Sequence, residues 1–434
     1  MFSDPFQRYV RSGIKPGLRR IRLLLKGMGN PERKFLSVVV AGSNGKGTTA
    51  ASLHAILMAA NLRAGLFTSP HLVTVCERFR IDHMQCSARA LIDFERRFRT
   101  LCLDVGATYF EVTTACALWL FAKEKVDWAV LEIGLGGRWD ACNVVNPELS
   151  IITSISKEHT EYLGTTLAKI AREKAQVARP ERPSVVGRLP RAAERAMRSE
   201  LGKIGALPCW LGSDFNIDAV RLSPTGTRAT LADGKGTLNI RTSLLGQNAI
   251  LNSGLAATSF RLLCARGRVR MQGSISAAIQ KGIRSVDWPA RLQVVQSRPL
   301  TVLDVAHNES AILELVADWK RIWPGRKPWV VIGLLEGKLS PRIGKSLSDL
   351  TRNLVVTRPG SPRALDAVRL QRCFEPYFDD VRIETDVKRA LKSAQKSAGA
   401  RGAVLVCGSH YLVGTVLEEY ESLQPDWPKL TLRR

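Results

Sequence analysis

The chain has 434 residues, of which 45% are hydrophobic and 24% are charged. Because a single hydrophobic core stops growing at about 250–300 residues, this length predicts two domains. Lys and Arg number 64 against 39 Asp and Glu, which gives a formal charge of +25. Such a charge attracts anions but does not choose between nucleic acid, an anionic membrane and a small polyanion.

Local patterns argue against membrane, secreted and zinc-binding classes of protein. No uncharged apolar run reaches the roughly 18 residues that a membrane helix needs, and the N-terminus lacks a signal-peptide pattern. The nine cysteines include no CxxC pair and no zinc spacing, which predicts reduced thiols, several of them buried. We therefore expect a soluble, cytoplasmic protein.

Short apolar runs alternate with longer helical patterns, which predicts parallel α/β sheets covered by helices. The expected strands are 37–41, 128–133, 150–154, 301–305, 329–333, 354–357 and 403–407, and the expected helices are 49–60 and 109–123. The turn-rich stretch 214–242 predicts β-hairpins. Pro289 and Pro299 flank a short extended run, after which the α/β alternation restarts. We therefore expect domains at 1–293 and 294–434.

In residues 38–49 an apolar strand leads into a glycine-rich turn and then into a helix. Glycines let backbone N–H groups point at phosphate oxygens, and the helix N-terminus adds partial positive charge. Lys46 is expected to contact the β- and γ-phosphates, with Thr48 or Thr49 near Mg²⁺. The spacing differs from the common GxxxxGK(S/T) loop because Gly47 separates the lysine from the threonines. The alternative is a plain turn with a solvated lysine, but the strand–turn–helix context favours nucleotide binding.

A second signal is Glu132, which stands at the end of the apolar strand 128–133 and before a glycine-rich run. Ligands of open α/β sheets bind beyond the carboxyl ends of the strands. A carboxylate at that position suits Mg²⁺. Taken alone, such a glutamate is equally well explained as a capping or structural residue.

Several short motifs occur in a fixed order along the chain: SNGKGT (43–48), TSPHL (68–72), LEIGLGGR (131–138), TSI (153–155), HTE (159–161), AREKA (171–175), WPARL (288–292), DVAHN (304–308) and VCGS (406–409). Together they resemble folylpolyglutamate synthase and dihydrofolate synthase, the folate branch of the Mur-ligase superfamily. The resemblance covers essentially the whole chain. It implies a P-loop ATPase domain of the Mur-ligase type with a parallel sheet, followed by a smaller Rossmann-like α/β domain.

The resemblance also implies a site between the two domains, with ATP and two Mg²⁺ ions as cofactors. The residues that match nucleotide-binding positions are Asn44, Gly45, Lys46, Gly47, Thr48, Asn252, Arg291 and Asp304. The residues that match magnesium ligands are Ser69, Glu132, His159 and Lys174, the last as a carbamate. Catalytic roles fall to Lys46, His307 and Lys174. The residues that match pteroate contacts are Thr108, Tyr109, Phe110, Glu111, Arg138, Trp139 and Asp140, and residues 14–20 match a similar contact segment.

A few positions depart from the family's pattern. Asn248 and Ala249 stand where His-Gln is usual, and Glu158 replaces an Asp. Trp139 and Cys142 replace the smaller Leu and Thr, so the pterin pocket is expected to differ in shape. None of these changes removes a group that would bind phosphate or metal.

The implied reaction adds L-glutamate to dihydropteroate, to tetrahydrofolate, or to both. The γ-phosphoryl group of ATP activates the acceptor carboxylate as an acyl phosphate, which the glutamate amine then attacks. The expected partners are therefore small molecules, namely ATP, L-glutamate and a folate or pteroate, and we expect a monomer that binds neither nucleic acid nor membrane. The alternatives are another amide ligase of the Mur superfamily with a different acid, and a basic P-loop ATPase that binds nucleic acid.

Overall fold

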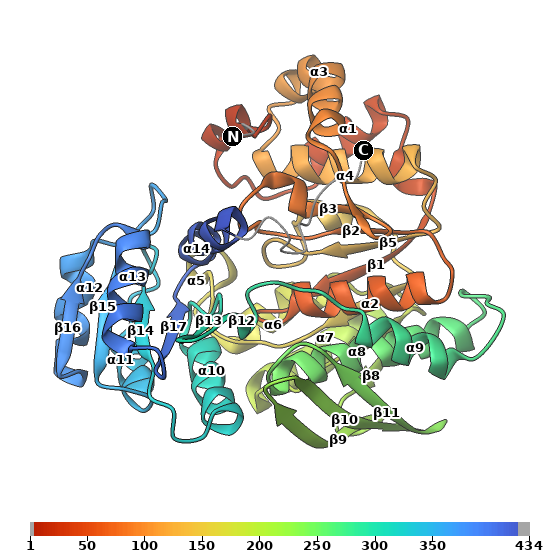
Figure 1. The fold of residues 1–434 in the computed structure, drawn as a ribbon. Helices are drawn as coiled ribbons and strands as arrows, with labels where there is room; N and C mark the ends of the chain where they lie inside the picture. Colours follow the sequence, from red (N-terminus) through yellow and green to blue (C-terminus); the bar gives the residue numbers. More distant parts are fainter. Residues whose placement is uncertain (1–3, 424–434) are drawn as a thin grey trace.

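The central strand of the first sheet is β1, Leu36–Ala41, and its alternate side chains enter two different cores. Val38 and Val40 pack with helices on one face, and Val39 and Ala41 pack with helices on the other. This is the period-two pattern of a strand that is covered on both sides. In the computed structural model, which describes residues 4–423, this sheet forms the centre of the larger part of the molecule (Figure 1).

The first sheet has eight strands in the order β4-β3-β2-β5-β1-β6-β7-β8. Its strands after β1 are β2 Ala64–Phe67, β3 Phe79–Ile81, β4 Met84–Gln85, β5 Trp128–Glu132, β6 Leu149–Ile152, β7 Pro183–Val186 and β8 Leu207–Trp210. All neighbouring pairs from β2 to β8 are parallel, while β3 and β4 form an antiparallel edge. The carboxyl ends of β1, β5 and β6 therefore meet at one edge of the sheet.

Helices cover both faces of this sheet. One face carries α1 Arg19–Gly27, α3 Ala88–Asp104 and α4 Tyr109–Lys123. The other carries α2 Lys46–Ala59, α8 Gln247–Ala265 and α9 Ile275–Arg284. Helices α6 Leu167–Ala175 and α7 Arg191–Ile204 pack beside β6 and β7 on the face of α1, α3 and α4. A three-stranded antiparallel sheet, β9 Phe215–Ser223, β10 Gly226–Asp233 and β11 Gly236–Thr242, lies against α8 and α9 (Figure 1).

The second large sheet has the order β12-β13-β17-β14-β15-β16, with only β12 antiparallel. Its strands are β12 Gln293–Ser297, β13 Leu300–Leu303, β14 Trp329–Ile332, β15 Asn353–Val356, β16 Asp380–Ile383 and β17 Ala403–Cys407. One face is covered by α10 Glu309–Ile322, α11 Pro341–Ser348 and α12 Ala367–Phe374, and the other by α13 Val387–Ala398 and α14 His410–Leu423.

The remaining elements are short. They are α5 Thr160–Leu163 and the 3₁₀ turns Gln7–Ser12, Pro31–Arg33, Val75–Arg78, Ala141–Val144 and Glu375–Tyr377. Within the part of the chain that the structure describes, no helix combines the length and the apolar character needed to cross a bilayer.

The predicted α/β class is confirmed, and every expected strand and helix is present within a few residues of its expected ends. The helix expected at 49–60 begins earlier, at Lys46, because Gly45 takes a left-handed conformation (φ 82°) and completes the turn. Strands β2, β3, β4, β7, β8 and β16 were not predicted; each contains a glycine, a proline or a polar residue that interrupts its apolar pattern. The nine cysteines form no disulfide, as expected.

Candidate active site

The glycine-rich turn between β1 and α2 is shaped by close packing. A Cβ on Gly42 would collide with the Thr153 side chain, and one on Gly45 would lie 2.6 Å from Asn252 Oδ1. Asn44 is fixed at the end of β6: its backbone N–H donates to Ser154 Oγ (3.0 Å), and its carbonyl accepts from Thr153 Oγ1 (2.6 Å). In the part of the chain that the structure describes, no side chain caps the N-terminus of α2, so its first N–H groups remain available to an anion.

Lys46 and Glu132 lie at the same edge of the first sheet, where β1 and β5 end. Val40 pairs with Glu132 across β1 and β5, and Lys46 follows β1 by one turn. Lys46 Nζ folds back over the turn and donates to the carbonyls of Gly42 (3.0 Å) and Ser43 (3.2 Å). Burial raises the pKa of Glu132, and the positive charge of Lys46 is the largest influence that opposes it. The ammonium and the carboxylate therefore act on each other at the carboxyl ends of two neighbouring strands.

The carboxylate of Glu132 is held by Ser69, whose backbone N–H donates to Glu132 Oε2 at 3.0 Å. Within residues 4–423, no three His, Cys, Asp or Glu side chains gather closely enough to hold a metal ion by themselves. Mg²⁺ commonly keeps several waters and takes only one or two protein carboxylates beside phosphate oxygens. Glu132 with Ser69 fits such a site, because a hard carboxylate oxygen and a hydroxyl-bearing residue lie beside the phosphate-type loop.

Lys174, on α6, is the most deeply buried cation of the site. Its side chain is 2% exposed, and Nζ lies 2.8 Å from Glu158 Oε1 and 2.9 Å from the Gly42 carbonyl. Burial lowers the pKa of Lys174. Burial also opposes ionisation of Glu158, but the positive charges of Lys174 and Lys46 outweigh it and lower the pKa of Glu158 to about 2. The pair is therefore an ammonium and a carboxylate. His159 follows Glu158 with a left-handed backbone (φ 45°), and burial lowers its pKa.

The second sheet contributes residues from the loop after β13. Asn308 Nδ2 donates to Asn44 Oδ1 (3.1 Å), which ties this loop to the phosphate-type loop. Asp304 accepts from the backbone N–H groups of Leu292 (2.9 Å) and Ala306 (2.8 Å). Burial lowers the pKa of Arg291, and the charge of Asp304 opposes that shift only in part. Arg291 also acts on Glu132, so the segment that leads into β12 reaches this carboxylate.

Two of the expected pteroate contacts are used within α4. Thr108 and Glu111 form a capping box: the Thr108 hydroxyl accepts from Glu111 N–H (3.3 Å), and Glu111 Oε2 accepts from Thr108 N–H (2.8 Å). Arg20 Nε also donates to Glu111 (3.0 Å). Both side chains are buried and cap α4, and their contact with a pteroate stays a prediction.

The other two predicted pteroate contacts of α4, Phe110 and Tyr109, have different surroundings. Phe110 packs over Gly134, where a Cβ would lie 2.6 Å from the ring, and it can therefore line the loop after β5. The Tyr109 hydroxyl donates to Asp4 (2.7 Å), and the guanidinium of Arg78 lies over its ring at 5.3 Å.

The three predicted pteroate contacts in the loop after β5 have different environments. Asp140 is buried, accepts from the N–H groups of Leu135 (2.8 Å) and Cys142 (2.9 Å), and has its pKa raised by burial to about 6. Arg138 lies 3.6 Å from Glu173 on α6. Trp139 is 53% exposed, which is unusual for so large an apolar side chain.

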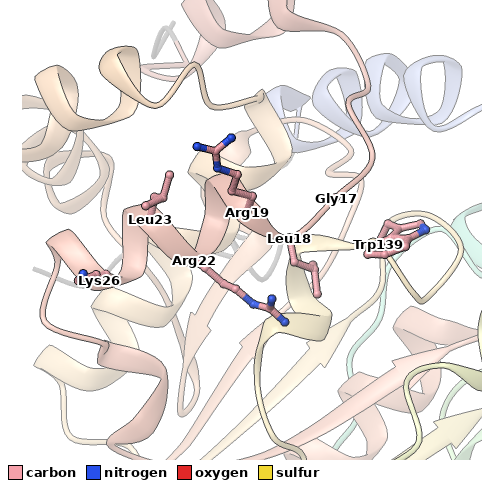
Figure 2. A pocket seen from close by; sticks show the side chains of 7 residues that line it. All are labelled: Gly17, Leu18, Arg19, Arg22, Leu23, Lys26 and Trp139. Carbon is pink, nitrogen blue, oxygen red and sulfur yellow. The ribbon is translucent and has the colours of Figure 1, made fainter.

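Trp139 lines an open pocket of about 500 Å³ beside the start of α1 (Figure 2). The other lining residues are Gly17, Leu18, Arg19, Arg22, Leu23 and Lys26. Figure 2 shows Trp139 on a separate loop across from Leu18 and Arg22. The pocket thus joins the N-terminal segment, expected as a contact segment, to the loop after β5. An aromatic side chain opposite aliphatic ones suits a flat organic ring.

Three site residues carried no assigned role in the sequence. His410 begins α14, directly after the VCGS motif, and its ring centroid lies 5.5 Å from that of His307. Arg78 Nε donates to His71 Nδ1 (3.0 Å) beside Ser69. The available signal was position alone for His71, which lies in the TSPHL motif after β2, and for His410, which follows the VCGS motif after β17; Arg78 had no such signal.

Comparison with known proteins places the chain in a family. The model of the Mur ligase middle domain matches residues 40–260, and that of the Mur ligase, glutamate ligase domain matches residues 290–410. Dihydrofolate synthase/folylpolyglutamate synthase of Escherichia coli K12 is 33% identical over 410 residues, covering 93% of this chain and 91% of that protein. A probable bifunctional folylpolyglutamate synthase/dihydropteroate synthase of Haloferax volcanii is 35% identical over 418 residues, and there the chain spans about half (48%) of the relative's length.

Solved structures agree over nearly the whole chain. Folylpolyglutamate synthase of Mycobacterium tuberculosis, complexed with ADP and AMPPCP, superposes with a TM-score of 0.89 at 30% identity, covering 95% of this chain and 97% of that one. E. coli FolC in complex with DHPP and ADP gives a TM-score of 0.86 at 31% identity, covering 96% of each chain. The matched domains, their order and their extent lead to one conclusion: the chain belongs to the folylpolyglutamate synthase/dihydrofolate synthase family of Mur ligases.

Proposed function

We propose that the chain is an ATP-dependent ligase that adds L-glutamate to dihydropteroate, to tetrahydrofolate, or to both through an acyl phosphate. The observation that carries this proposal is the meeting of Lys46 and Glu132 at the carboxyl ends of β1 and β5, with Arg291, which precedes β12, acting on the same carboxylate. A phosphate-type loop, a carboxylate suited to Mg²⁺ and a second cation are parts that phosphoryl transfer requires.

ATP would bind with its phosphates on the turn at 42–45 and the N-terminus of α2. Lys46 would exchange its two loop carbonyls for phosphate oxygens, and Gly47 and Thr48 would supply N–H groups from the first turn of α2. Asn252, packed on Gly45, and the half-buried Arg291 and Asp304 lie where they can contact the nucleotide. The ADP and AMPPCP complexes of relatives support this placement.

Glu132 and Ser69 would hold a first Mg²⁺, which neutralises charge on the phosphates when it is bound. His159 and a carbamate on Lys174 are proposed as ligands of a second ion. Because Lys174 is paired with Glu158 here, the carbamate requires the Lys174 amine to leave that carboxylate first. Lys46 would stabilise the transferring phosphoryl group, whose charge is spread over its oxygens.

In the reaction, the acceptor carboxylate attacks the γ-phosphorus, and ADP leaves. The resulting mixed anhydride has a good leaving group, so the amine of L-glutamate attacks its carbonyl carbon and phosphate departs. Closing the cleft between the two sheets would exclude water that hydrolyses the anhydride. The pocket of Trp139 would receive the pteroyl end of the acceptor.

The test is a product assay with the purified chain, ATP, Mg²⁺ and L-glutamate, with dihydropteroate and tetrahydrofolate offered separately. A mass increase of one glutamyl residue, matched by ADP release, is the expected result for at least one acceptor. Lys46→Ala should abolish turnover, whereas Lys123→Ala, an exposed lysine at the far end of α4, should not change it. Turnover by Lys46→Ala, or glutamylation of neither acceptor, would contradict the proposal.

The division into residues 1–293 and 294–434 is likewise a proposal, supported by the start of β12 at Gln293. A monomeric state, a cytoplasmic location and the absence of a nucleic-acid partner stay predictions.

A further inference from the structure

Two histidine rings face each other where the second sheet meets the candidate site. His307 follows β13, and His410 follows β17, the neighbouring strand of the second sheet. Their ring centroids lie 5.5 Å apart, and the ring planes are tilted by 58°. Because a hydrogen bond spans about 3 Å, rings at this separation are close enough for one small group to bond to both.

The hydrogen bond of His307 fixes its tautomer. His307 Nδ1 lies 2.8 Å from the Val305 carbonyl oxygen, which can only accept, so Nδ1 carries the proton. The neutral ring then offers a lone pair at Nε2. Burial lowers the pKa of His307 to about 4, and nearby cations, chiefly Lys338, act in the same direction, so the ring stays neutral near pH 7.

His410 has no hydrogen-bonding partner for its ring anywhere in residues 4–423, so both ring nitrogens are available to a ligand. Burial holds the pKa of His410 well below its usual value, and His307, Arg291, Lys46 and His71 add to this effect. A neutral imidazole has one donor and one acceptor nitrogen. The side chains of Lys46 and Arg291 carry only hydrogen-bond donors. Among the groups that act on His410, the acceptor nitrogens therefore belong to histidines.

We propose that His410, together with His307, binds the amino group of the incoming L-glutamate by accepting its two N–H bonds. This inference rests on the proposed ligase function and adds a binding residue to it. With both hydrogens of the amine bonded to imidazole nitrogens, the nitrogen lone pair points away from the histidines and toward the acyl phosphate. The covalent step is unchanged: the C–N bond forms, the C–O bond to phosphate breaks with its electron pair leaving on phosphate, and one N–H proton of the amine passes to the imidazole nitrogen that accepts it.

An amine fits these two nitrogens better than a phosphate does. A phosphate oxygen at neutral pH is an acceptor, so it cannot bond to the Nε2 lone pair of His307. The surrounding cations also disfavour an ammonium and thereby favour the free amine, which is the nucleophilic form. The donor groups of Lys46 and Arg291 would bind phosphate oxygens. The acceptor nitrogens of the two histidines would bind the amine.

His410→Phe tests the inference, because phenylalanine keeps a ring of similar size without an acceptor. We expect the KM for L-glutamate to rise about tenfold, the effect of losing one hydrogen bond. Formation of the acyl phosphate, trapped by hydroxylamine as a hydroxamate in the absence of glutamate, should stay at the wild-type rate. His83→Phe makes the same substitution at an exposed turn and should change neither quantity.

His410→Gln returns an acceptor oxygen and should restore the KM for L-glutamate to within about threefold of the wild-type value. If His410→Phe does not fold, His410→Ala with added imidazole replaces it, and recovery of glutamate use by imidazole is the expected result. An unchanged KM in His410→Phe, or no recovery in His410→Ala, overturns the role of His410. Failure of the wild-type chain to form any hydroxamate would instead overturn the proposed function.

Discussion

Asn248 Nδ2 donates a hydrogen bond to Glu314 Oε2 over 2.6 Å and so joins the first turn of α8 to α10. Asp318 on α10 accepts from the Gln247 backbone N–H at 2.9 Å. Two carboxyl groups of the second sheet's helix thus meet the N-terminus of α8, whose own N-cap, Gly246, has no side chain to offer. The departure from the family's His-Gln at this place therefore has a structural role at the junction.

This junction predicts a pH dependence of stability. Burial raises the pKa of Glu314 to about 7, and nearby Asp318 adds to the shift. A carboxyl group whose pKa is higher in the folded than in the unfolded chain binds its proton more tightly when folded, so stability falls as the pH rises from about 4.5 to about 7. We expect the thermal midpoint of the wild type, relative to that of Glu314→Gln, to decrease between about pH 5 and about pH 7. This difference isolates Glu314 from Asp318, Asp140 and His307, whose pKa values are also shifted by burial. Glu375→Gln changes an exposed acid that follows α12, and its thermal midpoint should equal that of the wild type across this pH range.

Gly45→Ala should weaken ATP binding at least tenfold. Its φ of 82° is unfavourable for alanine by about 1–2 kcal/mol, and the new Cβ would lie 2.6 Å from Asn252 Oδ1, so the turn must open. Gly202→Ala is the matched control, since this glycine lies within α7 with no atom near the added Cβ. The control should raise stability by about 0.5–1 kcal/mol with ATP affinity unchanged. Titration calorimetry and thermal unfolding measure both; equal ATP affinity in the two variants would contradict the assignment of the loop.

Glu158→Gln should destabilise the fold by about 3–5 kcal/mol, because it leaves the Lys174 ammonium buried without its carboxylate. The pKa of Glu158 is lowered to about 2, so its contribution is present above about pH 4.5 and is lost as the pH falls toward 2. Glu194→Gln removes the exposed ion pair with Arg198 and should cost less than about 1 kcal/mol. Urea unfolding at neutral pH compares the two; similar losses would mean that the buried pair contributes little.

Trp139→Ala should raise the KM for the pteroyl acceptor about tenfold, since the ring supplies apolar contact area that a bound acceptor would cover. ATP affinity and the thermal midpoint should stay at their wild-type values, because Trp139 is 53% exposed in the free protein. Leu313→Ala, which removes an exposed apolar side chain (60%) on α10, should change none of these quantities. Steady-state kinetics with the acceptor varied is the measurement, and an unchanged KM would remove Trp139 from the acceptor site.

The sequence by itself determined the α/β class, the order of the elements and the phosphate-type loop. These features depend on local patterns: strands such as β1 are apolar on both faces, and the turn at 42–45 joins a strand to a helix. The ordered motifs also located Lys46 and Glu132 at the ends of strands. Strand ends of a parallel sheet meet at one edge, so their proximity followed from the fold class.

Only the tertiary structure decided which of the candidate side chains are free to bind a ligand. Glu111 is used to cap α4 and to pair with Arg20, 91 residues away in sequence, while Trp139 stands open to solvent. Likewise, Lys174 is paired with Glu158, and the His410 ring lies near His307 with no hydrogen-bond partner among residues 4–423. Such outcomes depend on distances between segments far apart in the chain. Short-range patterns carry no information about those distances, whereas packing of the two sheets fixes them.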